Sequence, residues 1–102
     1  MRITSEAFLA EASENFPKAA KFLKGWETAV RAANWKNLQD VRKTYSNADA
    51  VVEESGRKVV VFNVCGNDYR LIAALHYNRQ IAYTLKFMTH AEYSKNRWKH
   101  EL

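Results

Sequence analysis

The chain has 102 residues, of which 47% are apolar and 13% aromatic, and its net charge is +5. This length suits one hydrophobic core, and the apolar content is too high for a disordered chain. Three Gly and one Pro exclude collagen-like and linker-like chains. No apolar run approaches the roughly 18–20 residues that span a bilayer, and no signal-peptide pattern opens the sequence. We therefore expect a single soluble, cytoplasmic domain over residues 1–102, with no membrane partner.

The positive charge is confined to the C-terminal part of the chain. Residues 1–56 contain eight Lys or Arg and eight Asp or Glu, so their net charge is zero. Residues 57–102 contain eight Lys or Arg against three Asp or Glu, which leaves the whole excess of five charges there. This asymmetry suggests an anionic partner, with nucleic acid as the first candidate. A basic surface that only confers solubility explains the charge equally well.

Helical patterns dominate the N-terminal half. Residues 2–4 either form a short strand or lead directly into a helix. Ser5 is a suitable N-cap for a helix that ends near Asn15, and Pro17 fits the first turn of a second helix. The two helices are expected to form an antiparallel hairpin, followed by a short helical turn over residues 38–45. The apolar side chains that the second helix should bury are Phe22, Leu23, Trp26, Val30 and Ala33.

Strand patterns follow from residue 50 onward. Strands are predicted over residues 50–53, 59–64, 69–77 and 81–88, and tight turns join the last three into an antiparallel meander. Thr89 can cap a last helix over residues 90–98. The sequence thus predicts an α+β domain in which the helices cover one face of a mainly antiparallel sheet. The other face of the sheet is expected to be free.

Alternation along the strands assigns side chains to these two faces. Arg70 and Lys86 fall in the more polar sets of two neighbouring strands, so both are expected on the open face. Two cations there would suit a phosphate, although a solvated strand cation is the more common role. In the last strand, the set expected to pack against the helices is Ile81, Tyr83, Leu85 and Phe87.

His90 and Tyr93 follow the strand that contains Lys86. Because they are three residues apart on a predicted helix, their side chains face the same way and can reach the basic face. His exchanges protons near neutral pH, and Tyr donates a hydrogen bond or a proton. A capping His beside a half-buried Tyr is the structural alternative.

Several catalytic motifs are absent from the sequence. It contains no glycine-rich phosphate loop and no G-x-S-x-G elbow. The three histidines lack the spacing of metal ligands, and the single Cys65 excludes a multi-thiolate site within one chain. We therefore expect neither a metal nor a cofactor, and we expect Cys65 to pack as a small hydrophobic residue. Arg, Lys, His and Tyr without a metal suit attack by a ribose 2′-hydroxyl on the neighbouring phosphate.

Two segments resemble a known family. Residues 61–73 read VFNVCGNDYRLIA and residues 86–93 read KFMTHAEY. Their sequence, order and spacing, from Trp35 to about Lys95, resemble the HigB branch of the RelE-like toxins. The resemblance implies a RelE-like fold and the toxin of a type II toxin–antitoxin pair, a metal-independent endoribonuclease that cleaves mRNA in the ribosomal A site. It also implies a cognate HigA-type helix-turn-helix antitoxin, and operator DNA bound only through the antitoxin complex.

The resemblance also implies roles for individual residues. Arg70 matches the strand arginine that contacts the scissile phosphate, while His90 and Tyr93 fall where the family has acid–base residues. Lys86 is a predicted phosphate contact. RelE has a lysine pair in the preceding strand where this chain has none, so we take His90 as the candidate general base. Further contacts to message or ribosomal RNA are expected from Arg57, Lys58 and Lys95.

The missing lysines also support a second hypothesis from another class, a non-catalytic basic module that binds RNA or an antitoxin-like partner. Such a module would be a degenerate homologue of the toxins. Loss of His90 would leave binding intact under both hypotheses, whereas it would abolish toxicity only if the chain is a nuclease. A helix-turn-helix regulator fits less well, because the helices lie in the neutral half of the chain.

Overall fold

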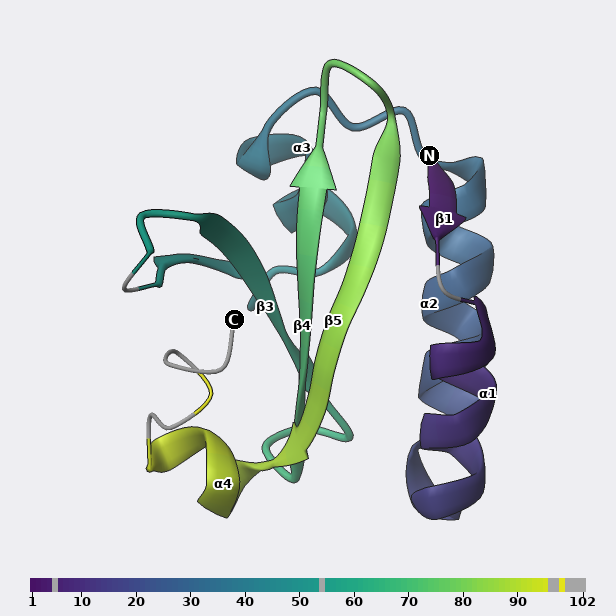
Figure 1. Cartoon of the computed structure of the whole chain (residues 1–102). Helices are drawn as coiled ribbons and strands as arrows, with labels where there is room; N and C mark the ends of the chain where they lie inside the picture. Colours follow the sequence, from purple (N-terminus) through teal and green to yellow (C-terminus); the bar gives the residue numbers. More distant parts are fainter. Residues whose placement is uncertain (5, 54, 96–97, 99–102) are drawn as a thin grey trace.

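A computed structural model describes residues 1–4, 6–53, 55–95 and 98 of the chain. Within this part the fold is α+β, as predicted, with most helices before the run of strands β2 to β5 (Figure 1). In chain order the elements are β1 (Arg2–Thr4), α1 (Glu6–Asn15), the 3-10 helix η1 (Pro17–Ala19), α2 (Ala20–Ala32), α3 (Leu38–Thr44), β2 (Asp49–Val52), β3 (Lys58–Val64), β4 (Tyr69–His76), β5 (Ile81–Thr89) and α4 (His90–Ser94). No helix in these residues is long and apolar enough to cross a membrane.

The sheet has five strands in the order β1-β5-β4-β3-β2. Strands β2 to β5 pair antiparallel, which confirms the predicted meander and extends it by β2. Residues 2–4 form a strand and pair with β5 in parallel. A parallel pair needs a long crossover, and the N-terminal helices are part of the chain that provides it. The result is a mixed sheet whose β3–β4 and β4–β5 turns lie at opposite ends.

Helices α1 and α2 run antiparallel on one side of the sheet, as Figure 1 shows. The main hydrophobic core lies between them and the sheet. Leu23, Trp26 and Val30 of α2 are buried there, as predicted, against Phe62 of β3 and Leu71 of β4. The rings of Trp26 and Phe62 meet edge to face at 5.5 Å. Two further predicted core residues, Phe22 and Ala33, are only partly buried beside this core.

A register shift between β4 and β5 changes which side chains of β5 face the helices. Ile72 pairs with Lys86, whereas its neighbour Ala73 pairs with Thr84, so Leu85 is an extra residue in β5. Such a bulge reverses the alternation of side chains along a strand. Ala82 therefore packs in the main core. The predicted helix-facing set is therefore correct for Phe87, which packs against the main core, and wrong for Ile81, Tyr83 and the bulged Leu85.

The second face of the sheet is covered in part, so the prediction of a free face is wrong. Trp98, only 2% exposed, packs there against Val59 and Val61 of β3, Ile72 of β4 and Met88 of β5. We call these five residues the second cluster. The bulged Leu85 and Tyr93 pack against it.

Helix α4 ends at Ser94, before the predicted end at residue 98. Residues 96–97 of the predicted helix lie outside the described residues, and so does the predicted N-cap Ser5.

Candidate active site at the start of strand β4

Arg70 occupies the second position of β4, and its side chain is only 7% exposed. A buried guanidinium is costly unless its N–H groups are hydrogen-bonded. Nη1 donates to the carbonyl oxygens of Asn67 at 3.2 Å and Tyr69 at 2.9 Å. Nη2 donates to Oδ1 of Asn67 and lies 3.1 Å from Nδ1 of His90. The β3–β4 turn thus holds the Arg70 side chain in a defined position beside His90.

The turn that holds Arg70 is itself tied to neighbouring elements. Cys65 and Gly66 have positive φ angles of 53° and 70°, which the tight turn requires. Lys18 of η1 forms an ion pair with Asp68 at 2.5 Å. The Cys65 side chain is partly buried against the main core, in line with the expected packing role.

His90 is the first residue of α4, at the end of β5. Thr89 caps this helix as predicted, because its hydroxyl accepts a hydrogen bond from the Glu92 N–H at 3.2 Å. The backbone N–H of His90 donates to the carbonyl of Asp68 at 2.9 Å. Helix α4 is therefore joined to the β3–β4 turn at the residue whose imidazole contacts Arg70.

The contact with Arg70 determines the tautomer of neutral His90. A guanidinium only donates hydrogen bonds, so Nδ1 of His90 must be the acceptor. The proton of the neutral ring then resides on Nε2. In this arrangement the single lone pair of the imidazole points at Arg70, and Nε2–H is the group that can meet a ligand.

Tyr93 lies over the guanidinium of Arg70. The Arg70 Cζ atom is 5.4 Å from the centre of the Tyr93 ring, within the range of a cation–π contact. Burial raises the pKa of the Tyr93 phenol above its usual value of 10.0, and the positive charge of Arg70 opposes this shift. The phenol therefore keeps its proton at neutral pH and can act as a donor.

The structure thus brings together three residues that the sequence singled out: Arg70, His90 and Tyr93. Lys86 lies on the same face, because its pairing partner Ile72 is two positions beyond Arg70 along β4. Lys95 is exposed at the C-terminal end of α4. Lys86 precedes His90 by four positions in the chain, and Lys95 follows Tyr93 by two.

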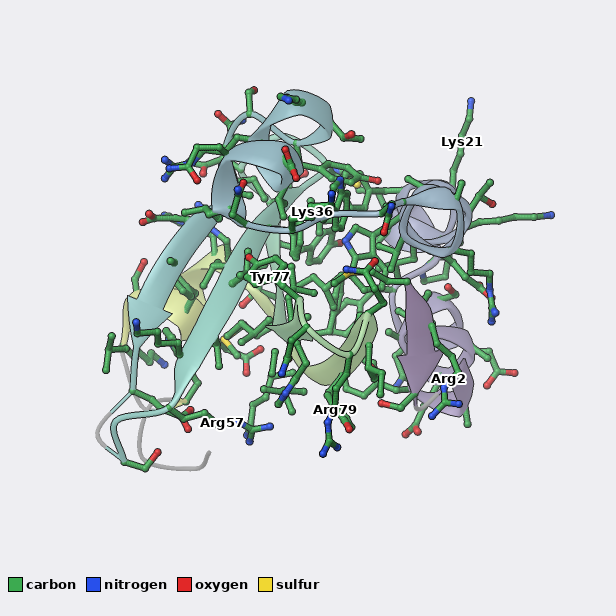
Figure 2. All side chains as sticks on the ribbon, turned by 90° about the horizontal axis from the view of Figure 1, so that it is seen from above. Arg2, Lys21, Lys36, Arg57, Tyr77 and Arg79 are labelled. Atoms are coloured by element: carbon green, nitrogen blue, oxygen red, sulfur yellow. The ribbon has the colours of Figure 1, made fainter. Side chains whose placement is uncertain are left out.

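Arg57 and Lys58 lie elsewhere. Asn63 is the residue opposite Arg70, and Lys58 precedes it by five positions on β3, which is roughly 17 Å along the strand. Figure 2 shows Arg57 extending outward on the same side of the molecule as Arg79 and Arg2. The predicted RNA contacts therefore do not form one cluster, because Arg57 and Lys58 lie at the end of β3 that is far from Arg70.

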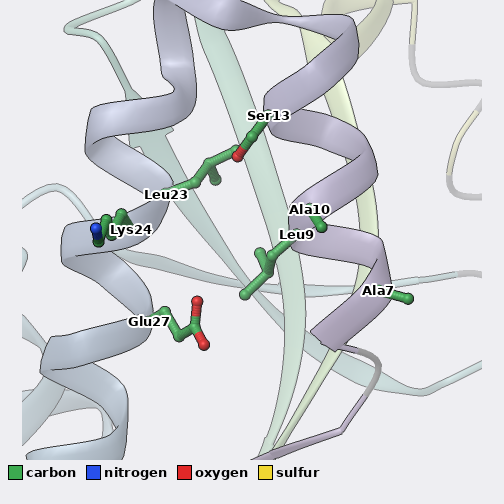
Figure 3. A pocket seen from close by; sticks show the side chains of 7 residues that line it. All are labelled: Ala7, Leu9, Ala10, Ser13, Leu23, Lys24 and Glu27. Carbon is green, nitrogen blue, oxygen red and sulfur yellow. The ribbon is translucent and has the colours of Figure 1, made fainter.

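A groove of about 380 Å³ lies between α1 and α2, with Leu9, Leu23 and Glu27 among its lining residues (Figure 3). It lies on the helical side and contains none of the predicted site residues. Among the described residues, no group of three or more His, Cys, Asp or Glu is arranged to hold a metal ion.

Residues 19–96 match the family model of the HigB toxin, described as the RelE-like toxic component of a toxin–antitoxin system. The match spans most of the chain. This chain belongs to the HigB toxin family. Membership in the HigB family implies an antitoxin partner.

Individual HigB proteins are similar over nearly their whole length. The mRNA interferase toxin HigB of Escherichia coli strain K12 is 26% identical over 93 residues, which cover 91% of this chain and 88% of that protein. The mRNA interferases HigB of Escherichia coli O157:H7 and Shigella flexneri match to the same extent.

The sequence analysis did not identify two residues that contact the site residues, Asn67 and Trp98. Asn67 was predicted only as part of a turn, although the side chain of an Asn three residues before a strand Arg can accept a hydrogen bond from that Arg. Trp98 was predicted only as the end of a helix. Its size and apolar character were the only signals, since burial against β3, β4 and β5 depends on the tertiary structure.

Proposed function

We propose that this HigB-family chain is the toxin of a type II toxin–antitoxin pair and a metal-independent, ribosome-dependent mRNA endoribonuclease. The observation that supports the proposal is the contact set of Arg70, whose guanidinium meets His90 at 3.1 Å and lies under the Tyr93 ring. Metal-free cleavage of RNA needs a base, an acid and a cation for the phosphate, and an imidazole, a phenol and a guanidinium can supply these three functions. The mRNA interferase names of the HigB relatives agree with this assignment.

In the first step, the scissile phosphate binds Arg70. An anionic phosphate is a stronger acceptor than a neutral imidazole, so it displaces His90 from Nη2 of Arg70. Asn67 continues to hold the other side of the guanidinium. The exchange frees the Nδ1 lone pair of His90, which then becomes available as a base.

In the second step, Nδ1 of His90 takes the proton of the ribose 2′-hydroxyl. The 2′-oxygen forms a bond to the adjacent phosphorus, and the bond from phosphorus to the 5′-oxygen breaks. The products are a 2′,3′-cyclic phosphate and a 5′-hydroxyl. Arg70 stabilises the extra negative charge of the phosphorane, with Lys86 as a second cation on the same face.

The leaving 5′-oxygen takes a proton from Tyr93. Because burial raises the pKa of this phenol, the proton is in place at neutral pH. The imidazolium of His90 releases its proton to solvent after the cut, and Tyr93 regains one. The protons therefore balance over one turnover.

The proposed partners follow the family. They are mRNA on the ribosome, ribosomal RNA and a HigA-type helix-turn-helix antitoxin, and operator DNA is reached only through the antitoxin complex. Lys86 and Lys95 contact the message near the cut, whereas Arg57 and Lys58 contact RNA at the distant end of the sheet. The toxin acts in the cytoplasm.

The experiment that tests the nuclease is induced expression of the wild type and of His90→Ala, with growth recorded and message 5′ ends mapped. His76→Ala is the matched control, because His76 is an exposed histidine at the far end of β4. We expect growth arrest and new cuts in the wild type and in His76→Ala, and neither in His90→Ala. Arrest without cuts in all three would contradict the nuclease and favour a non-catalytic RNA-binding module.

A purified system tests the finer parts of the proposal. Message is incubated with the protein, with and without ribosomes, and with EDTA and a HigA-type antitoxin added separately. We expect cleavage only with ribosomes and inhibition of that cleavage by the antitoxin. We also expect cleavage on ribosomes to be unchanged when EDTA chelates trace transition metals and free Mg²⁺ is held constant for the ribosomes. Cleavage of free RNA would contradict ribosome dependence without affecting the assignment of the nuclease.

A further inference from the structure

Helix α4 holds two of the three proposed catalytic side chains, yet it has little to fix it in place. It is five residues long, and none of these residues, all of which are described, is fully buried. A helix shorter than about 12 residues is marginal in water by itself. The Thr89 cap and the His90 N–H bond secure only its first turn. The end that contains Tyr93 needs another anchor.

Trp98 contacts Tyr93 in two ways. The indole and phenol rings stack with their centres 5.4 Å apart and an angle of 14° between their planes. The indole Nε1 also donates a hydrogen bond to the backbone carbonyl of Tyr93 at 3.2 Å. Trp98 therefore constrains both the ring and the backbone of Tyr93.

Trp98 is in turn fixed to the sheet. It is 2% exposed and packs in the second cluster with Val61, Ile72 and Met88. Ile72 and Met88 belong to the strands next to the site, since Met88 pairs with Arg70 and Ile72 follows Arg70 by two positions. A chain of contacts thus runs from the sheet through Trp98 to Tyr93, and from Tyr93 to Arg70 and His90.

We propose that Trp98 is a positioning residue for the active site, holding Tyr93 and α4 against Arg70. The inference rests on the proposed function for the roles of those three side chains. The family match ends at residue 96, so Trp98 is a feature of this chain outside the matched segment. Its contribution is to place the phenol and the imidazole relative to the guanidinium, and a misplacement of about 1 Å can cost about 100-fold in rate.

The test compares two substitutions at one position. Trp98→Phe keeps an aromatic ring for the stack, whereas Trp98→Leu keeps an apolar side chain in the second cluster and loses the stack. Trp35→Phe and Trp35→Leu are the matched controls, because Trp35 is a buried tryptophan of the main core. If Trp98→Leu does not fold, Trp98→Met replaces it, since methionine adapts to irregular space.

The first readout is kcat and KM for message cleavage on the ribosome. We expect Trp98→Leu to lose about 10- to 100-fold in kcat with KM little changed, and Trp98→Phe to recover most of it. Both Trp35 variants should keep the wild-type kcat per folded molecule. A folded Trp98→Leu with wild-type kcat would overturn the inference, and so would equal losses in Trp98→Phe and Trp98→Leu.

The second readout does not depend on activity. In alkaline buffer, where the imidazoles are neutral, the ring ¹⁵N shifts of His90 report its tautomer, with His90→Gln used for assignment. We expect a single Nε2–H form in the wild type and Trp98→Phe, and a mixture of tautomers in Trp98→Leu. If the wild type cleaves no message, the proposed function fails, whereas these shifts still decide whether Trp98 positions the site.

Discussion

Both faces of the sheet are buried in part, but one buries mainly apolar side chains, whereas the other also buries the charged Arg70. The helical face rests on a continuous core formed by α1, α2 and the strands β1, β3, β4 and β5, with Leu71 fully buried in it. The other face has the second cluster of five residues, and Arg70 lies next to it under α4. Arg70 and Leu71 are neighbours in sequence on opposite faces. Burial stabilises the fold on one side, whereas on the other it orients a charge.

Leu71 and Arg70 differ in what compensates each of them for the loss of contact with water. Leu71 loses only contact with water, so its burial is favourable in itself. Arg70 retains its charge, and the hydrogen bonds that it donates to the carbonyl oxygens of Asn67 and Tyr69 replace those to water. The helical face should therefore respond to substitution mainly in stability, and the site face mainly in catalysis.

The largest expected effect is that of Arg70→Ala. We expect cleavage to fall by about 10²–10⁴-fold, because the phosphate loses its cation and His90 loses its partner. The free energy of unfolding should also fall by about 1–3 kcal/mol, since acceptors in the β3–β4 turn are left without a donor. A loss of stability is expected because Arg70 is buried and hydrogen-bonded, not solvated on an open face.

Single-turnover cleavage and urea unfolding measure the two effects of Arg70→Ala separately. Arg79→Ala is the control, because Arg79 is an exposed arginine in the β4–β5 turn. Full cleavage by a folded Arg70→Ala protein would contradict the assigned role.

Leu71→Ala sharpens the comparison from the other side. The truncation leaves a cavity in the main core and should lower the free energy of unfolding by about 2–5 kcal/mol. Cleavage per folded molecule should remain near that of the wild type, because Leu71 faces away from the site. Urea unfolding combined with cleavage at low temperature measures both. A catalytic loss as large as that of Arg70→Ala in folded protein would show that the two faces are not independent.

The smallest effect is on alkaline stability, and both faces contribute to it. Burial raises the pKa of Tyr45 beside the main core and of Tyr93 beside the second cluster above 10.0. The folded protein then keeps these protons at a pH where the unfolded chain has lost them, so stability should decrease as the pH rises above about 10. Tyr45→Phe and Tyr93→Phe should each flatten this decrease in a pH series of urea midpoints. A midpoint that is constant above about pH 10 would contradict the assignment.

Much of the fold follows from local patterns, and these were predictable. Apolar spacing and capping residues located α1, α2 and α4, with Thr89 at the predicted cap. Strand alternation and turn residues located the antiparallel strands. The resemblance to the HigB family, carried by residues 61–73 and 86–93, also placed Arg70, His90 and Tyr93 in one site, and the three side chains do meet.

Other features depended on contacts between distant residues. The extra residue Leu85 in β5 reversed the expected faces, because a bulge depends on how β4 and β5 pair and not on the composition of β5. The burial of Arg70 and the cover provided by Trp98 were decided in the same way.

The sequence by itself therefore determined the elements, their order, the family and the three candidate catalytic residues. The tertiary structure decided the register of β5, the hydrogen bonds that orient Arg70, and the residue that holds Tyr93 above it. The physical reason is that periodicity and capping act over a few neighbouring residues. Register and cover depend on side chains that meet only after the chain has folded.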